Sequence, residues 1–227
     1  MKPDLFWVLD LAALFLPSIR QICDRPPVVA ARFNYVPRPI TADRILELVE
    51  AALADGLIFL DEFEIRSVGR TPLVSQRITS KSNFIRSWGD ETKDWFYGLT
   101  MKGGSTWEEA AQPDWQQFFR DEYDELEGHE YVTLSARSIT TLQRAVRFLE
   151  RLRSRRIGAL SREQARHVAP WDATYWKRLP EGLEVCLPVM DIDGRLQEQV
   201  AVDEVRAFRQ FCEFGFSRAR ARRIVDE

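Results

Sequence analysis

The residues that most often carry metal-binding or nucleophilic chemistry are few and far apart in this chain. It contains two histidines, His129 and His167, and three cysteines, Cys23, Cys186 and Cys212, among 227 residues. A zinc site or a disulfide framework needs such residues in pairs at short spacings, and no CxxC pair is present. The sequence therefore indicates no metal ligands, and the unpaired cysteines favour a reducing cytoplasm.

Two glycine-containing motifs could bind a ligand, but each lacks the other residues that such a site needs. Gly103-Gly104 has neither a P-loop nor a GxGxxG pattern around it. The segment Asp191-Ile-Asp193-Gly194 begins like a calcium loop without its later ligands, and Asp-Gly is typical of a hairpin turn. Nothing brings a particular pair of carboxylates together for acid–base catalysis. We therefore predict no catalytic residue, no cofactor and a non-enzymatic protein.

Charged residues form two opposed blocks behind a net charge of only -3. Residues 105–130 hold nine acidic residues and one arginine, whereas residues 137–178 hold eleven basic residues and three acidic ones. Three interpretations are open. The blocks neutralise each other or are solvated faces; the acidic block docks a basic protein; or the arginines hold a phosphate backbone.

Aromatic residues cluster near the acidic block and near residue 175, and core packing is the simplest interpretation of them. Tryptophan and tyrosine also dominate binding hot spots, so some of these rings are candidate interface anchors. The protein-binding candidates are the acidic residues together with three aromatic ones: Glu108, Asp114, Asp121, Glu122, Asp124, Glu125, Trp107, Trp115 and Phe119. The nucleic-acid-binding candidates of the alternative interpretation are Arg66, Arg70, Arg77, Lys81, Arg86, Arg147, Arg151 and Arg155.

The apolar segment at residues 5–16 is too short to cross a membrane. It carries Asp10 near its centre and ends before Pro17, whereas a spanning helix needs roughly 20 apolar residues. Lys2 is the only early positive charge, which is poor for a signal peptide. The segment predicts a buried first helix, a cytoplasmic protein and no membrane partner.

The pattern of elements in the first half mixes helices and strands. Thr41 is a good N-cap for a helix that ends at Asp55-Gly56, and Thr100 or Ser105 can cap the helix that holds Trp107. Asp61 interrupts a strand face, which indicates a bulge or a sheet edge. The expected helices are at 5–16, 42–54, around Trp107 and from Pro113 through Phe119, the expected strands at 57–65 and 95–99, and the expected irregular segments at 24–39 and 66–94.

The pattern changes near Gly128, so we expect one region at 1–127 and a second, smaller one at 128–227. Pro188 lacks a backbone donor and favours an edge position, and Cys186 alternates into the core. The fold class is α+β. The expected elements of the second region are a strand at 131–134, a helix from Ser138 through Leu152, a short helix opened by a capping box at 161–164, a β-hairpin of 183–190 with 196–202, and helices at 203–211 and from Ser217.

Two segments of the first half resemble the winged-helix superfamily. One is the helix from Ile45 that ends in Asp55-Gly56-Leu57-Ile58, and the other is Phe96-Tyr97-Gly98-Leu99-Thr100-Met101-Lys102-Gly103. In that family the second block closes the wing and begins the next helix. The resemblance implies a winged-helix-like first half and, as an alternative function, a nucleic-acid-binding regulator.

The helix at 42–54 departs from a winged-helix recognition helix. It carries Arg44 beside Asp43, Glu47 and Glu50, and acidic side chains repel phosphates. A proline-rich stretch at 25–39 also replaces the compact helix-turn. The resemblance therefore supports the fold more than DNA binding.

A further segment resembles bacterial proteins of which some are similar to immunity proteins of toxin systems. It reads Gly103-Gly104-Ser-Thr-Trp107-Glu108, followed by Pro113-Asp114-Trp115. Together with the acidic block, it leads to the principal functional prediction. We expect a protein-binding module, in its concrete form an immunity or antitoxin-like protein that neutralises a basic toxin domain.

Overall fold

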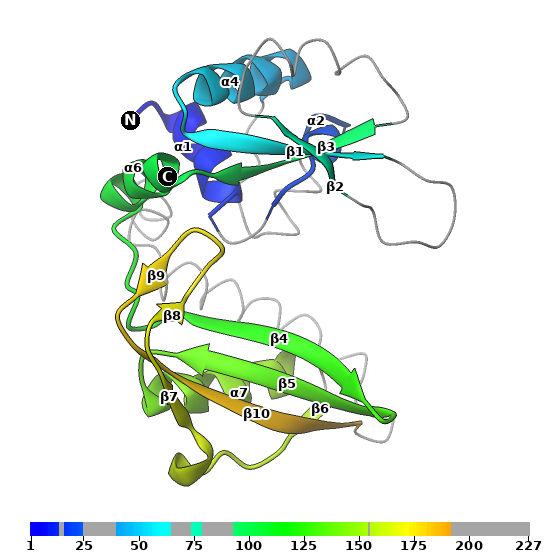
Figure 1. Ribbon diagram of the computed structural model, residues 1–227, viewed down its shortest axis with the longest axis vertical. Coiled ribbons are helices and arrows are strands. Elements are labelled where there is room, and N and C mark those ends of the chain that lie inside the picture. The colour runs from blue at the N-terminus through cyan, green and yellow to red at the C-terminus, as the bar shows by residue number, and fades with distance from the viewer. Residues whose placement is uncertain (14–15, 25–39, 65–73, 79–92, 154, 192–227) are drawn as a thin grey trace. The chain divides into compact units, whose positions relative to one another are not determined.

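The computed structural model describes residues 1–13, 16–24, 40–64, 74–78, 93–153 and 155–191, which belong to two compact units (Figure 1). Unit 1 comprises Met1–Ala110 and Thr174–Trp176, and unit 2 comprises Ala111–Ala173 and the chain from Lys177 onward. Each unit combines helices with antiparallel strands, so the predicted α+β class is confirmed. None of the described helices is long and apolar enough to cross a membrane.

Unit 1 is built from helices and one antiparallel sheet with the strand order β2-β1-β3. The helices are α1 (Pro3–Leu11), α2 (Ile19–Asp24), α4 (Ala42–Ala54) and α6 (Met101–Ala111), and the strands are β1 (Ile58–Glu64), β2 (Val74–Ile78) and β3 (Lys93–Leu99). Strand β2 lies within the stretch that the sequence predicted to be irregular.

Helix α4 has the boundaries that its capping residues predict. The Thr41 hydroxyl accepts a hydrogen bond from the Arg44 N–H at 3.3 Å, which satisfies one of the free donors of the first turn. At the other end Gly56 adopts a φ of +66°, where a side chain would be strained. One stripe of the helix is buried, as its spacing predicts: Ile45, Leu48, Val49, Ala52 and Leu53.

Strand β1 is the central strand of the unit 1 sheet, so Asp61 is not at an edge. The register shift lies one residue further on, between Glu62 and Phe63. Asp61 is only 3% exposed, and Arg77 on β2 donates to both of its carboxylate oxygens, at 2.7 and 2.9 Å. A buried carboxylate is tolerated here because a two-pronged ion pair compensates for its lost hydration.

The glycines Gly103 and Gly104 allow α6 to pack closely within unit 1. A Cβ at Gly103 would lie 1.8 Å from the Leu57 carbonyl oxygen, and one at Gly104 would lie 2.1 Å from the Trp176 ring. The Thr100 hydroxyl accepts from the Gly103 N–H at 3.0 Å, so Thr100 rather than Ser105 caps the helix. These glycines therefore have a packing role.

The tripeptide Thr174–Trp176 belongs to unit 1 although it lies far along the chain. The Tyr175 hydroxyl accepts from the Leu99 N–H at 2.6 Å and donates to the Ala12 carbonyl oxygen. Burial raises the pKa of this hydroxyl well above the usual value for tyrosine. The Trp176 indole N–H donates to the Ala13 carbonyl oxygen at 2.8 Å.

Unit 2 is centred on an antiparallel sheet with the order β4-β5-β10-β6, and β7 also pairs with β10. A separate two-stranded sheet joins β8 to β9. The strands are β4 (Phe119–Leu126), β5 (His129–Ala136), β6 (Arg155–Ile157), β7 (Arg166–Val168), β8 (Trp171–Asp172), β9 (Arg178–Leu179) and β10 (Gly182–Asp191), and the helices are α7 (Ile139–Arg153) and the 3-10 turn η1 (Arg162–Gln164).

Helix α7 covers one face of this sheet (Figure 1). The Ser138 hydroxyl accepts from the Thr141 N–H at 3.1 Å, as expected for the residue that begins the helix. Cys186 is exposed rather than buried, because its neighbours Val185 and Leu187 occupy the core side of β10. The core contains Val132, Leu134, Ala136, Leu142, Ala145, Val146, Leu149, Ile157, Val185 and Leu187.

The predicted helix from Pro113 through Phe119 is wrong, because Phe119 begins strand β4. Phe119 and Tyr123 both pack against the core of unit 2, and a spacing of four residues fits one face of a strand as well as one face of a helix. The tight turn after β4 places Glu127 and Gly128 at φ values of 54° and 78°, as a two-residue hairpin requires. The predicted boundary near Gly128 therefore falls in a hairpin of unit 2.

Pro188 lies in an inner strand, between β5 on one side and β6 and β7 on the other, rather than at an edge. Its carbonyl oxygen accepts from the Gly158 N–H at 2.9 Å, so its nitrogen faces the same side of β10. On that side β7 pairs with β10 only as far as Glu184, and β6 pairs with it only from Val189. The missing N–H of Pro188 therefore interrupts neither the pairing of β10 with β7 nor its pairing with β6. The predicted hairpin partner at 196–202, and the helices predicted beyond it, lie outside the described residues.

Candidate functional site

The face of the unit 2 sheet opposite α7 is the candidate functional surface, and we refer to it as the open face. Side chains alternate along each strand, so the partners of the core residues point to this face. It carries Arg120, Glu122, Asp124 and Leu126 from β4, His129, Tyr131, Thr133 and Ser135 from β5, and Glu184, Cys186, Pro188 and Met190 from β10.

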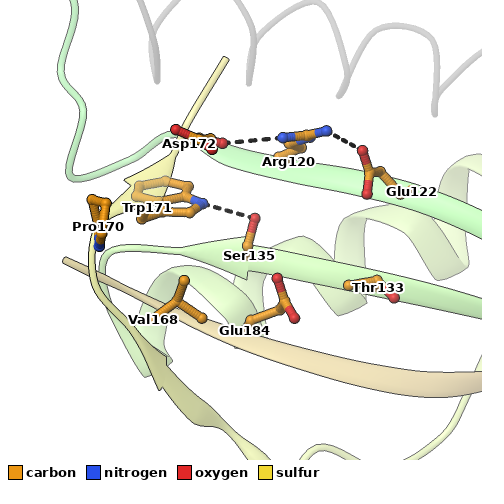
Figure 2. A pocket seen from close by; sticks show the side chains of 9 residues that line it. All are labelled: Arg120, Glu122, Thr133, Ser135, Val168, Pro170, Trp171, Asp172 and Glu184. Atoms are coloured by element: carbon orange, nitrogen blue, oxygen red, sulfur yellow. Dashed lines mark hydrogen bonds and ion pairs between the residues drawn. The ribbon is translucent and has the colours of Figure 1, made fainter. Parts of the chain in front are cut away.

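One end of the open face, which we call the ion-paired end, contains a hollow of about 160 Å³ (Figure 2). Arg120 lies between two partners: it donates to the Asp172 carbonyl oxygen at 3.1 Å and to the Glu122 carboxylate. Figure 2 shows this arginine bridging β4 and β8 at the rim. On the opposite side, the Arg166 Nε donates to the Glu184 carboxylate at 3.0 Å.

Trp171 forms one wall of the hollow and is fixed by its surroundings. It is 2% exposed, and its indole N–H donates to the Ser135 hydroxyl at 3.0 Å (Figure 2). Gly182 lies against the ring, where a Cβ would come within 2.7 Å of it. The indole is therefore a structural support for the hollow and is not a mobile anchor.

The carboxylate of Asp172 is held in its ionised form at this end. The Arg178 guanidinium donates to it at 2.6 Å, and this hydrogen bond, with the nearby charges of Arg178 and Arg120, lowers the pKa of Asp172 below its ordinary value. The same contact raises the pKa of Arg178. Both groups are exposed, so salt screens their attraction.

The charged side chains that line the hollow are paired with one another or with neighbouring arginines. Its lining contains neither histidine nor cysteine, and each carboxylate in it has an arginine partner. The Ser135 hydroxyl accepts from the Trp171 indole N–H, and Glu184, which the strand register places opposite Ser135, is paired with Arg166. Among the described residues, no group of histidine, cysteine, aspartate and glutamate is arranged to hold a metal ion.

The other end of the open face differs, and we call its exposed or half-buried apolar side chains the apolar strip; the exposed His129 also lies at this end, directly beside Leu126. The strip consists of Leu126, Tyr131, Cys186, Pro188 and Met190. Leu126 is 64% exposed and Met190 is 47% exposed. Tyr131 lies directly between Pro188 on β10 and Asp124 on β4. Apolar and acidic side chains are therefore neighbours at this end.

Four of the predicted protein-binding residues are brought together on β4. Asp121, Glu122, Asp124 and Glu125 are all exposed, with Glu122 and Asp124 on the open face and the other two on the face of α7. Asp124 and Glu125 make no hydrogen bond or ion pair with any residue in the described part of the chain. These two carboxylates are therefore available to a partner.

The predicted aromatic anchors are less exposed than expected. Trp107 belongs to unit 1 and is 0% exposed, with its indole N–H donating to the Asp10 carboxylate at 2.8 Å, so it cannot be a surface anchor. Trp115 is half-buried against Phe118, with ring centroids 5.4 Å apart. Phe119 is half-buried and packs against the core of unit 2.

The remaining acidic candidates do not join the β4 group. Glu108 lies on α6 in unit 1, where it is half-buried. Asp114 stabilises a turn, because its carboxylate accepts from the Gln116 N–H at 3.1 Å and from the Gln117 amide at 2.9 Å. Only the β4 acids form an exposed group among the predicted acidic residues.

The basic candidates are only partly described. The Arg77 guanidinium lies 4.1 Å from the centre of the Phe59 ring and pairs with Asp61, which raises the pKa of this arginine. Arg147 is exposed on α7, Arg151 belongs to the same helix, and Arg155 begins β6. Arg66, Arg70, Lys81 and Arg86 lie outside the described residues.

The sequence analysis missed the apolar strip. Its members on β5 and β10 alternate with core residues. Tyr131 therefore lies on the face of the sheet that its neighbour Val132 does not share, and the same holds for Pro188 and its neighbour Leu187. The alternation of core and outward-facing residues is visible in each strand of the sequence. The sequence does not show that β10 pairs with β5, so it does not show that these outward-facing residues are neighbours. Leu126 was missed because it follows a run of acidic residues.

Comparison with known proteins gives no match among family models, curated proteins or solved structures.

Proposed function

We propose that this chain is a protein-binding module that docks a basic protein on strand β4, and that its concrete role is that of an immunity or antitoxin-like protein. The observation that supports this most is the exposed acidic group on one strand: Asp121, Glu122, Asp124 and Glu125. A regular strand fixes these carboxylates in space, so a partner meets a defined charge pattern.

The charge of β4 is only partly neutralised within the chain, which favours a partner. Arg120 pairs with Glu122, whereas Asp124 and Glu125 have no counter-ion in the described part of the chain. Complementary charges accelerate encounter and set the orientation of two proteins. A basic toxin domain has the charge that this strand requires. We place the protein in the cytoplasm, where its cysteines would stay reduced.

A matched pair of charge-reversal variants tests this function. The full chain, Asp124→Lys/Glu125→Lys and a control of equal charge change, Asp55→Lys/Glu109→Lys at exposed positions of unit 1, are used as bait for proteins of the source cell. We expect the full chain and the control to retain a basic partner that salt elutes, and the double variant to lose it. Equal retention by all three would contradict the proposed surface.

The geometry gives less support to a winged-helix nucleic-acid regulator. On α4, the Arg44 guanidinium pairs with Glu47 at 2.8 Å and lies 3.7 Å from Asp4, so it is not a free phosphate contact. A filter-binding assay with duplex DNA at low salt distinguishes the two functions, because a phosphate binder must lose affinity steeply as salt rises.

A further inference from the structure

We propose that the apolar strip of the open face receives an amphipathic basic segment of the partner, in which apolar side chains contact the strip and a lysine or arginine contacts Asp124. The inference rests on the proposed function and adds the chemistry of the bound segment. It also moves the centre of the docking surface from the β4 acids alone to the strip beside them.

The composition of the open face departs from that of a solvated sheet face. The outer face of an antiparallel sheet is ordinarily polar. At the ion-paired end this holds, and every carboxylate there has an arginine partner. At the other end, Leu126 and Met190 expose most or nearly half of their surface, and Pro188 and Cys186 are exposed as well. Such a patch is typical of an interaction surface.

Unmatched charge lies at the same end as this exposed apolar surface. The register places Asp124 directly beside Tyr131, and Tyr131 directly beside Pro188. Side chains in such pairs are about 5 Å apart, so a bound segment that covers the strip also reaches Asp124. Burying Asp124 without a cation would be unfavourable, which requires a basic group in the segment. The occupant must therefore be both apolar and cationic.

The first experiment uses a synthetic peptide that alternates lysine and leucine as the probe, titrated into the full chain at low salt. Two comparison peptides keep one property each: lysine alternating with serine, and glutamate alternating with leucine. We expect the lysine–leucine peptide to bind at least about tenfold more tightly than either comparison peptide, because each of these lacks one component. Equal affinity for the lysine–leucine and lysine–serine peptides would overturn the role of the strip.

The second experiment changes the strip in the full chain. We expect Leu126→Ser/Met190→Ser to weaken binding of the lysine–leucine peptide about tenfold, while Met101→Ser, an exposed methionine of unit 1, leaves it unchanged. In an NMR titration, the amide resonances that the lysine–leucine peptide shifts should belong to residues of the open face. Perturbation of the α7 face instead would overturn the proposal. So would a full chain that dimerises and a strip variant that is monomeric but binds the peptide equally well, because the strip would then be covered by a second copy.

These experiments separate the two proposals. If the β4 acids bind a basic partner but the strip takes no part, charge reversal at Asp124 and Glu125 weakens the binding of both lysine peptides. The strip variant then weakens the binding of neither peptide. If the function itself fails, neither lysine peptide responds to charge reversal or to salt. Loss of fold is excluded by requiring that each variant keeps the unfolding midpoint of the full chain.

Discussion

Two sets of acidic side chains, one in each unit, have opposite surroundings. In unit 1, Asp10, Asp61 and Glu62 are 2%, 3% and 5% exposed, and each has a hydrogen-bonding partner: Trp107, Arg77 and Lys93. In unit 2, the acids of β4 are exposed, and Asp124 and Glu125 have no partner in the described part of the chain. The buried carboxylates of unit 1 are bonded within the fold, whereas the exposed ones of β4 are those that we propose to contact a partner.

The largest effect should come from removing one member of a buried ion pair. Arg77→Ala leaves Asp61 buried without its two-pronged partner, and we expect the free energy of unfolding to fall by about 3 kcal/mol. Replacing both residues by valine should recover most of that loss, because no uncompensated charge then remains. Urea denaturation measures both, with Arg44→Ala as an exposed control; equal losses for Arg77 and Arg44 would break the comparison.

A smaller effect should follow the loss of a single buried donor. Trp107→Phe keeps an aromatic ring in unit 1 but removes the N–H that donates to Asp10 at 2.8 Å. We expect a loss of about 2 kcal/mol, since the Asp10 carboxylate stays buried. Thermal unfolding measures the change. Trp115→Phe, at a half-buried ring, serves as the control and should be milder.

The exposed acids should affect stability hardly at all. Asp124→Asn and Glu125→Gln remove charge without changing shape, and we expect the free energy of unfolding to change by less than about 0.5 kcal/mol. Urea denaturation tests this. A loss comparable to that of Arg77→Ala would mean that β4 stabilises the fold through these charges, and the contrast between the units would fail.

The smallest effect concerns pH. Arg178 lowers the pKa of Asp172 in the folded state, so the contribution of this contact is present above the unfolded pKa and is lost as pH falls through the lower folded pKa. Carbon-detected NMR titration should show Asp172 titrating below an ordinary aspartic acid, and Arg178→Ala should raise its pKa. Unchanged titration in that variant would assign the shift to another cause.

The sequence predicted the elements whose local signals agree with their packing. Helices α4 and α7 have capping residues and one buried stripe, so their existence and class followed from Thr41, Ser138 and the spacing of apolar residues. The sequence failed where two structures share one pattern. Phe119 and Tyr123 fit a helix and a strand equally, and the pairing of β4 with β5 along its length identifies the strand.

The sequence predicted the charged residues of the candidate site but not which residues of other strands lie beside them. The acids of β4 are visible as a run in the sequence, whereas the pairing of Tyr131 with Asp124 and Pro188 depends on strand register across distant segments. Trp107 was a candidate anchor because the sequence alone does not show its contacts with distant residues. Its indole N–H donates to Asp10, which lies 97 residues earlier in the chain.

The inclusion of Thr174–Trp176 in unit 1 has a consequence for synthesis on the ribosome. Residues 1–110 emerge long before Tyr175 and Trp176, yet the Leu99 N–H and the Ala13 carbonyl are bonded by those two side chains. The amino-terminal unit can begin to collapse as it is translated but cannot complete its contacts until translation has passed Trp176. A nascent chain that is stalled between residues 110 and 176 would leave the Leu99 N–H and the Ala13 carbonyl without these partners and accessible to chaperones.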